Sequence, residues 1–176
     1  MAKPLHILIG GERGAGKSTL IEKLLENSVR PVYGFITKRL AADETGFHPI
    51  YIHPAGAAER AYTQENLIAM CNSRIHDPVL DVFNVLGVRY LKSRPGGIVV
   101  MDELGFLESK ADAFVKKVME TLDGDIPVLA AVKARFDVPF LNEVRAHPKA
   151  ALYTVTPENR DALYEELLPV IQSWNA

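Results

Sequence analysis

The feature that most constrains the fold of this chain is a glycine-rich segment near its start. The segment reads Gly11-Glu12-Arg13-Gly14-Ala15-Gly16-Lys17-Ser18. A short apolar run at 5–9 precedes it, and apolar residues at helical spacing follow it over 17–27. A strand, a glycine loop and the N-terminus of a helix together surround a phosphate group with backbone N–H donors. The segment therefore predicts a phosphate-binding loop.

Each residue type in this loop suits a polyphosphate bound with Mg²⁺. The three glycines leave room for the backbone to approach the β-phosphate. Lys17 supplies a mobile cation for the β- and γ-phosphates, and the hydroxyl of Ser18 is placed to ligate Mg²⁺. Thr19 adds a contact to the α-phosphate. We therefore expect residues 11–19 to bind a nucleoside triphosphate together with Mg²⁺.

The rest of the chain alternates between strand and helix patterns. Strand-rich segments at 32–39 and 47–53 flank the turn-type residues 43–46, which predicts a β-hairpin. The pattern over 54–78 is weak, and 79–92 has helical spacing. The remaining expected elements are strand 98–101, helix 111–122, strand 128–132, helix 139–146, strand 152–155 and helix 157–173, the last with Pro157 in its first turn behind the cap Thr156.

This alternation indicates an α/β fold with a mostly parallel sheet, helices on both of its faces, and the hairpin as an antiparallel addition. Such a three-layer sandwich is the architecture of P-loop NTPases. No linker, repeat or low-complexity tract divides the 176 residues, so we expect a single domain over 1–176. Ligands of such sheets bind at the carboxyl ends of the strands.

Two adjacent carboxylates follow the apolar strand 98–101. Asp102 is placed to hold the Mg²⁺ through a bound water, as the second motif of P-loop proteins does. Glu103 would then face the γ-phosphate, where it can orient or deprotonate an attacking water. Glu108 follows five residues later, and we expect its side chain to be solvated.

Composition excludes several classes of protein. The net charge is −2 and basic residues are interspersed with acidic ones, so nucleic acid is not an expected partner. No apolar stretch approaches the roughly 20 residues that span a bilayer. The single cysteine, Cys71, cannot form an internal disulfide and is expected to be a small buried residue. The chain shows no secretory leader pattern, so we expect a cytoplasmic protein, with a monomer as the default.

Scattered basic residues and histidines are weaker candidates. One of the cations near predicted loops could stabilise charge on a transferred phosphate. A surface role is the simpler interpretation of each, and the histidines lack the spacing of metal ligands. The cations concerned are Arg13, Lys38, Arg39, Arg135 and Arg160.

Three segments taken together carry a resemblance to a known family. They are the phosphate loop, Val100-Met101-Asp102-Glu103-Leu104-Gly105-Phe106-Leu107-Glu108, and Thr156-Pro157-Glu158-Asn159-Arg160-Asp161. In this order they resemble the THEP1-type nucleoside-triphosphatase family. The stretches at 34–39 and 46–47 also resemble that family's early hairpin. Two features depart from its pattern: Phe106-Leu107 replaces a usual Lys-Met pair, and the Gly-Tyr-Gly-Val stretch before the central helix has no clear match.

The resemblance implies a P-loop α/β domain with slow Mg²⁺-dependent hydrolysis of ATP, GTP and other nucleoside triphosphates. It also implies that Asn159 and Arg160, which follow the last strand, contact the base or sugar of the nucleotide. A nucleotide or nucleoside kinase is an alternative, with an acceptor held by the hairpin and by 54–78. A nucleotide-dependent switch with little turnover is a second alternative. The Asp-Glu pair favours the additional-strand, RecA-like strand order, although the sequence leaves the kinase-like order open.

Overall fold

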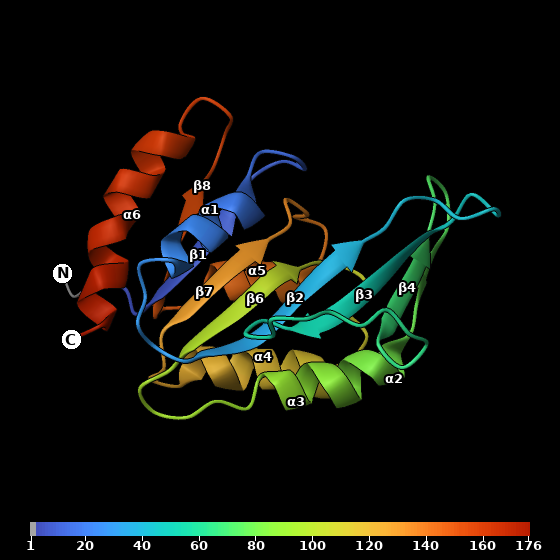
Figure 1. Cartoon of the computed structure of the whole chain (residues 1–176), viewed down its shortest axis with the longest axis horizontal. Coiled ribbons are helices and arrows are strands. Elements are labelled where there is room, and N and C mark those ends of the chain that lie inside the picture. Colours follow the sequence, from blue (N-terminus) through green and yellow to red (C-terminus); the bar gives the residue numbers. More distant parts are fainter. Residues whose placement is uncertain (1–2) are drawn as a thin grey trace.

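The computed structural model describes residues 3–176, which form an eight-stranded sheet between layers of helices (Figure 1). The strand order is β5-β4-β3-β2-β6-β7-β1-β8. The strands are β1 His6–Gly10, β2 Val32–Arg39, β3 His48–Pro54, β4 Leu67–Cys71, β5 His76–Pro78, β6 Ile98–Leu104, β7 Val128–Val132 and β8 Ala150–Thr154. The helical segments are α1 Lys17–Leu25, α2 Leu80–Val82, η1 Phe83–Gly87, α3 Val88–Tyr90, α4 Asp112–Asp123, α5 Pro139–Arg145 and α6 Arg160–Trp174.

The sheet has a parallel part and an antiparallel part. Strands β2, β6, β7, β1 and β8 run parallel to one another. Strands β3, β4 and β5 extend the sheet beyond β2 by antiparallel pairing. The predicted hairpin is β2–β3, and the carboxylate of Asp43 accepts hydrogen bonds from the backbone N–H groups of Thr45 and Phe47 in its turn. The predicted sheet with an antiparallel addition is therefore confirmed.

The order of the parallel strands determines which loops meet. β7 lies between β1, which leads into the phosphate loop, and β6, which carries Asp102 and Glu103. This is the additional-strand order that the Asp-Glu pair favours. The carboxyl ends of β1, β7 and β6 lie at the same edge of the sheet, because the three strands are parallel neighbours. The phosphate loop, the acidic pair and the residues after β7 consequently face one another.

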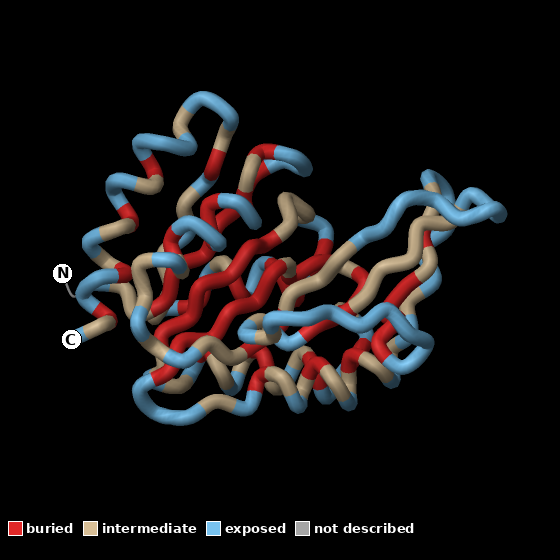
Figure 2. The backbone as a smooth tube through the Cα atoms, viewed as in Figure 1, coloured by how far each residue is buried: buried red, intermediate tan, exposed pale blue. Residues whose placement is uncertain are grey.

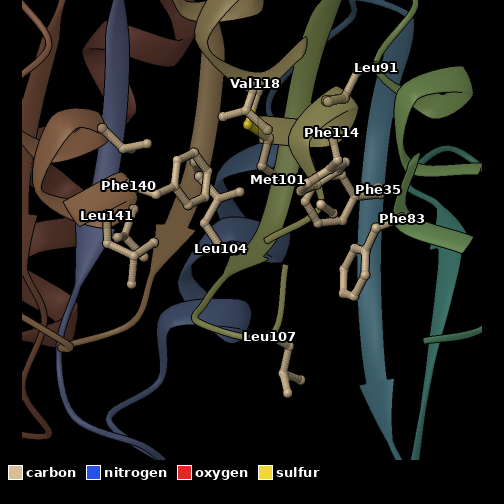
Figure 3. Close-up of a cluster of buried hydrophobic side chains, with 14 of the residues drawn as sticks. Phe35, Phe83, Leu91, Met101, Leu104, Leu107, Phe114, Val118, Phe140 and Leu141 are labelled. Carbon is tan, nitrogen blue, oxygen red and sulfur yellow. The ribbon is translucent and has the colours of Figure 1, made fainter. Parts of the chain in front are cut away.

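Helices cover both faces of the parallel strands (Figure 1). On one face, Leu20 of α1 and Leu167 of α6 belong to one apolar cluster with β1 and β7. On the other, Phe114 of α4, Leu141 of α5 and Phe83 of η1 belong to the second cluster, part of which Figure 3 shows. Strands β1, β6 and β7 are buried along most of their length (Figure 2). No helix within residues 3–176 is long and apolar enough to cross a membrane.

Two strands lie where the sequence pattern is weak. β4 is a five-residue apolar run inside the extension, and β5 pairs only three residues with it. The turn between them is held by Asn72, whose side-chain oxygen accepts from the N–H groups of Arg74 and Ile75 at 2.8 and 2.6 Å. The second half of the segment 54–78 thus completes the extension, whereas 55–66 connects β3 to β4 without forming a helix or strand.

Two expected helices differ in detail. The helix expected over 79–92 is helical from 80 to 90, but its centre, η1, is a π-helical turn. Gly87 allows this segment to lie close to α4, because a Cβ there would stand 2.5 Å from the Phe114 ring. The expectation that Pro157 lies in the first turn of the last helix is wrong. Helix α6 begins at Arg160, after a turn in which the N–H of Thr156 donates to the side-chain oxygen of Asn159 and the N–H of Asn159 donates to the hydroxyl of Thr156.

Candidate active site

The phosphate loop requires glycine at two positions for steric reasons. Gly11 has φ +143°, and a Cβ there would stand 2.5 Å from the carbonyl oxygen of Val155. Gly16 has φ +106°, a backbone conformation that residues with a side chain rarely adopt. Helix α1 begins directly after this loop, so its free N–H groups point toward the loop. The predicted strand, glycine loop and helix are therefore present, in the conformation that suits an anion.

Lys17 joins the phosphate loop to the acidic strand end. Its ammonium group donates to the carbonyl oxygens of Gly11 and Glu12, at 2.8 and 3.1 Å. The same nitrogen lies 3.3 Å from Oε2 of Glu103. The side chain is nearly buried, so its charge acts in a medium of low dielectric constant. A γ-phosphate in this loop would compete for the same ammonium group.

Ser18 and Asp102 come together as expected for two residues around one cation. The hydroxyl of Ser18 donates to Oδ1 of Asp102 at 3.0 Å. Burial raises the pKa of Asp102 to about 6, although the Ser18 hydrogen bond opposes that change and Glu103 adds to it. Mg²⁺ prefers oxygen ligands and is usually bound by one or two carboxylates together with substrate phosphates. The hydroxyl and carboxylate oxygens present here fit that ion.

Glu103 lies between two lysines. Oε2 contacts Lys17, and Oε1 lies 3.9 Å from Nζ of Lys133, which directly follows β7. Lys133 was not among the residues singled out from the sequence. Its position after the apolar run 128–132 was the available signal, because that strand ends at the same edge of the sheet as β6. Two positive charges therefore hold the carboxylate that faces the phosphate loop.

The expectation that Glu108 is solvated is wrong. Its side chain is buried, with 3% of the residue exposed, and Oε1 accepts a hydrogen bond from the backbone N–H of Gly105 at 2.5 Å. Burial raises the pKa of this carboxyl to about 7. The loop 105–108 folds back on itself after β6, which turns the side chain inward.

The two residues expected to contact the base or sugar of the nucleotide, Asn159 and Arg160, have different surroundings in the structure. Arg160 lies against Gly16 of the phosphate loop, and both residues line one cavity. The amide of Asn159 is used within the turn before α6: its oxygen accepts from the N–H of Thr156 at 2.7 Å, and its nitrogen donates to the carbonyl of Thr154 at 2.9 Å. Base or sugar contacts by these two residues remain a prediction.

A cavity of about 670 Å³ connects these groups. The phosphate loop, Asp102, Glu103 and Lys133 line one part, and the antiparallel extension lines another. Of the weaker cationic candidates, Arg13, Arg39 and Arg135 also line it, whereas Lys38 lines a separate cavity of about 70 Å³ behind Asp102. Arg135 is engaged by the carboxylate of Asp137 in two hydrogen bonds of 2.8 Å. The cavity volume falls within the range of about 300–1,000 Å³ that is typical of ligand sites.

A family model described as NTPase matches residues 6–168 of the chain. The chain belongs to this NTPase family. The resemblance inferred from the phosphate loop, the acidic strand end and residues 156–161 is therefore confirmed. The match spans every strand of the sheet, from β1 to β8, and most of α6.

Curated relatives of this NTPase extend over nearly the whole chain. It is 32% identical to "Nucleoside-triphosphatase THEP1" of Methanocaldococcus jannaschii, with 93% of this chain and 95% of the relative covered. It is 27% identical to the protein of the same name from Aquifex aeolicus, over 96% and 99% of the two chains. It is also 30% identical to the "Cancer-related nucleoside-triphosphatase homolog" of Bos taurus, over 96% and 97%.

A solved structure supports the fold of this NTPase. The crystal structure of THEP1 from the hyperthermophile Aquifex aeolicus superimposes with a TM-score of 0.72, covering 95% of this chain and 99% of that one. The two sequences are 24% identical in this comparison. The likeness shows that the two proteins share the arrangement of sheet and helices.

Proposed function

We propose that this NTPase hydrolyses nucleoside triphosphates to the diphosphate and phosphate, with Glu103 as the general base. The observation that carries the proposal is the position of Glu103, whose carboxylate contacts Lys17 of the phosphate loop and lies next to the Ser18–Asp102 pair. The names of the relatives, which describe nucleoside-triphosphatases, agree with this activity.

Each of these residues has a separate role in the proposed reaction. The backbone of 11–16 and the start of α1 bind the phosphates, and Lys17 stabilises the charge that develops on the transferred phosphoryl group. Glu103 accepts a proton from the attacking water, whose oxygen bonds to the γ-phosphorus while the bond to the diphosphate oxygen breaks. Mg²⁺, held through Ser18 and Asp102, supplies further neutralisation of phosphate charge when it is bound.

Several finer features belong to the proposal as well. ATP and GTP are both expected substrates, and Asn159 and Arg160 are expected to contact the base or sugar, because they follow the last strand and match the family's segment there. A cytoplasmic location, a monomeric state and the absence of nucleic-acid binding remain predictions. A switch with little turnover predicts near-zero phosphate release without a partner.

Substitution of Glu103 by glutamine tests the assignment. Glu103→Gln keeps the shape of the side chain but cannot accept the proton, so we expect the maximal rate to fall roughly 100-fold or more while nucleotide affinity is retained. Steady-state phosphate release gives the rate, and calorimetry with a non-hydrolysable ATP analogue gives the affinity. Glu143→Gln, on the exposed side of α5, is the matched control. Wild-type turnover in the Glu103 variant would remove the general-base role.

A further inference from the structure

A lysine ammonium group has three donors, and each donor of Lys17 has an acceptor within reach. The acceptors are the carbonyl oxygens of Gly11 and Glu12, at 2.8 and 3.1 Å, and Oε2 of Glu103 at 3.3 Å. A γ-phosphate oxygen that accepts from this group therefore displaces one of the three contacts. The contact with Glu103 is the longest, and its carboxylate is the group that a bound triphosphate repels. We expect the contact between Lys17 and Glu103 to break when the triphosphate binds.

A second cation, Lys133, lies at the other oxygen of the same carboxylate. Its Nζ is 3.9 Å from Oε1 of Glu103, whereas Lys17 contacts Oε2. Lys133 directly follows β7, the parallel neighbour of the strand that carries Glu103, so it reaches the carboxylate from a separate segment (Figure 1). The Glu103 carboxylate therefore keeps one cation after Lys17 has turned to the phosphate.

The loop that follows Glu103 holds the side chain of Lys133 in place. The backbone N–H of Lys133 donates to the carbonyl oxygen of Leu104 at 2.9 Å. Its aliphatic stem lies against Gly105, where a Cβ would stand 3.2 Å from Cδ of Lys133. Its ammonium nitrogen lies 5.2 Å from the centroid of the Phe106 ring, within the range of a cation–π contact. Lys133 is therefore anchored to the same segment, 103–106, as the carboxylate that it faces.

The charges around Glu103 make such a cation necessary. Asp102 directly precedes it, and a terminal phosphate brings further negative charge to the same site. Like charges repel strongly where water is partly excluded, yet a general base must stay within hydrogen-bond reach of the attacking water. Arg135 also lies over the Phe106 ring, 4.5 Å from its centroid, but its guanidinium is bound by Asp137 in two hydrogen bonds of 2.8 Å. The ion pair with Lys133 is the contact that can counter this repulsion.

We propose that Lys133 is a positioning residue for hydrolysis, which holds the Glu103 carboxylate toward the attacking water once Lys17 has turned to the γ-phosphate. The carboxylate thus exchanges one lysine for the other when the triphosphate binds. Lys133 itself contacts neither the phosphate nor the water in this arrangement. The inference rests on the proposed function, because Lys133 acts only through Glu103.

Single variants of Lys133 separate positioning from nucleotide binding. Lys133→Gln removes the charge, and we expect kcat for ATP hydrolysis to fall roughly 10-fold or more while KM changes by less than about twofold. Lys133→Arg keeps the charge and should retain most of the wild-type rate. Lys116→Gln, which breaks an exposed ion pair of the same 3.9 Å length with Glu120 on α4, is the matched control. Calorimetry with a Mg²⁺-bound non-hydrolysable ATP analogue gives the nucleotide affinity, which we expect Lys133→Gln to retain.

A double-mutant cycle shows whether Lys133 acts through Glu103. Single-turnover hydrolysis of γ-³²P-labelled ATP measures the slow variants, and we expect Lys133→Gln to cause less than about a twofold further loss when Glu103→Gln is already present. The same loss in both backgrounds, or a weaker nucleotide affinity in Lys133→Gln, would mean that Lys133 acts on the phosphate and would overturn the proposal. Wild-type turnover in Lys133→Gln, or a rate in Lys133→Arg as low as in Lys133→Gln, would also overturn it. Wild-type turnover in Glu103→Gln would instead reject the general base, so the two failures are distinguishable.

Discussion

Asp102 combines a charge with burial, and this combination determines how its site depends on Mg²⁺. Its carboxylate accepts the Ser18 hydroxyl at 3.0 Å. Asp102→Asn keeps the shape and one oxygen while removing the negative charge that attracts the ion. We expect the Mg²⁺ concentration for half-maximal hydrolysis to rise roughly 10-fold or more, with the rate at saturating Mg²⁺ less affected. A Mg²⁺ titration of phosphate release measures this, with the exposed Asp81→Asn as control. An unchanged titration would exclude Asp102 from metal binding.

The buried carboxyl of Glu108 predicts a pH dependence of stability. Burial raises its pKa from 4.5 to about 7 in the folded protein. Between these two values the folded state holds the proton more tightly than the unfolded state, so the free energy of unfolding falls as pH rises through this window. The full loss, present above pH 7, is about 3 kcal/mol at 1.36 kcal/mol for each pKa unit.

Glu108→Gln removes the titrating group while its amide oxygen can still accept the Gly105 N–H. We expect the variant to equal the wild type in stability near pH 4.5 and to exceed it at pH 8. Urea unfolding of both proteins at the two pH values checks this difference. If the variant and the wild type differ by the same free energy of unfolding at both pH values, Glu108 does not have a raised pKa in the folded protein.

At the scale of elements, the junction of β1, the phosphate loop and α1 depends on backbone conformations that few residues other than glycine adopt. Gly11→Ala combines a positive φ with a Cβ 2.5 Å from the Val155 carbonyl oxygen. We expect a loss of about 1–3 kcal/mol in the free energy of unfolding together with weaker nucleotide binding. Gly46→Ala is the matched control, because Gly46 has φ +80° but nothing within 4 Å of the added Cβ. Equal losses in the two variants would show that the contact with Val155 is unimportant.

How well an element could be predicted from sequence depended on how much of its pattern is local. β1, β6 and β7 are apolar runs buried on both faces, so their residues alone indicate a central parallel strand. β4 and β5 are short and belong to a sheet extension, and their pairing with β3 depends on distant residues. The inward turn of Glu108 likewise depends on the fold of the loop 105–108, which no periodicity records.

The residues of the candidate site that could be predicted are those that belong to a local sequence motif. The phosphate loop, Asp102 and Glu103 each follow a strand that is recognisable from sequence, and the sheet brings them together. Lys133 required the strand order, because it reaches the site from a loop that is adjacent to Glu103 only in space. Sequence patterns report neighbours along the chain, whereas the cavity is lined by residues from segments that are far apart in the sequence.

At the scale of the whole molecule, one continuous sheet links the phosphate loop to the antiparallel extension. The chain has a natural spectroscopic or chemical probe near each end of this sheet. Trp174, the single tryptophan, is buried in the cluster around α1 and α6. Cys71, the single cysteine, is buried in β4 within the extension. Because β2 and β6 join the two regions through continuous pairing, we expect residues 1–176 to unfold as one cooperative domain.

Urea unfolding followed by Trp174 fluorescence and by the equilibrium reactivity of the Cys71 thiol should therefore give one common midpoint. A non-hydrolysable ATP analogue with Mg²⁺, at 100 times its dissociation constant, should stabilise both regions equally by about 2.7 kcal/mol. The shift arises because the ligand binds only the folded phosphate loop, and cooperativity transmits it to β4. Exposure of Cys71 at a lower urea concentration than the Trp174 transition, or a ligand shift confined to Trp174, would mean that the extension unfolds as a separate unit.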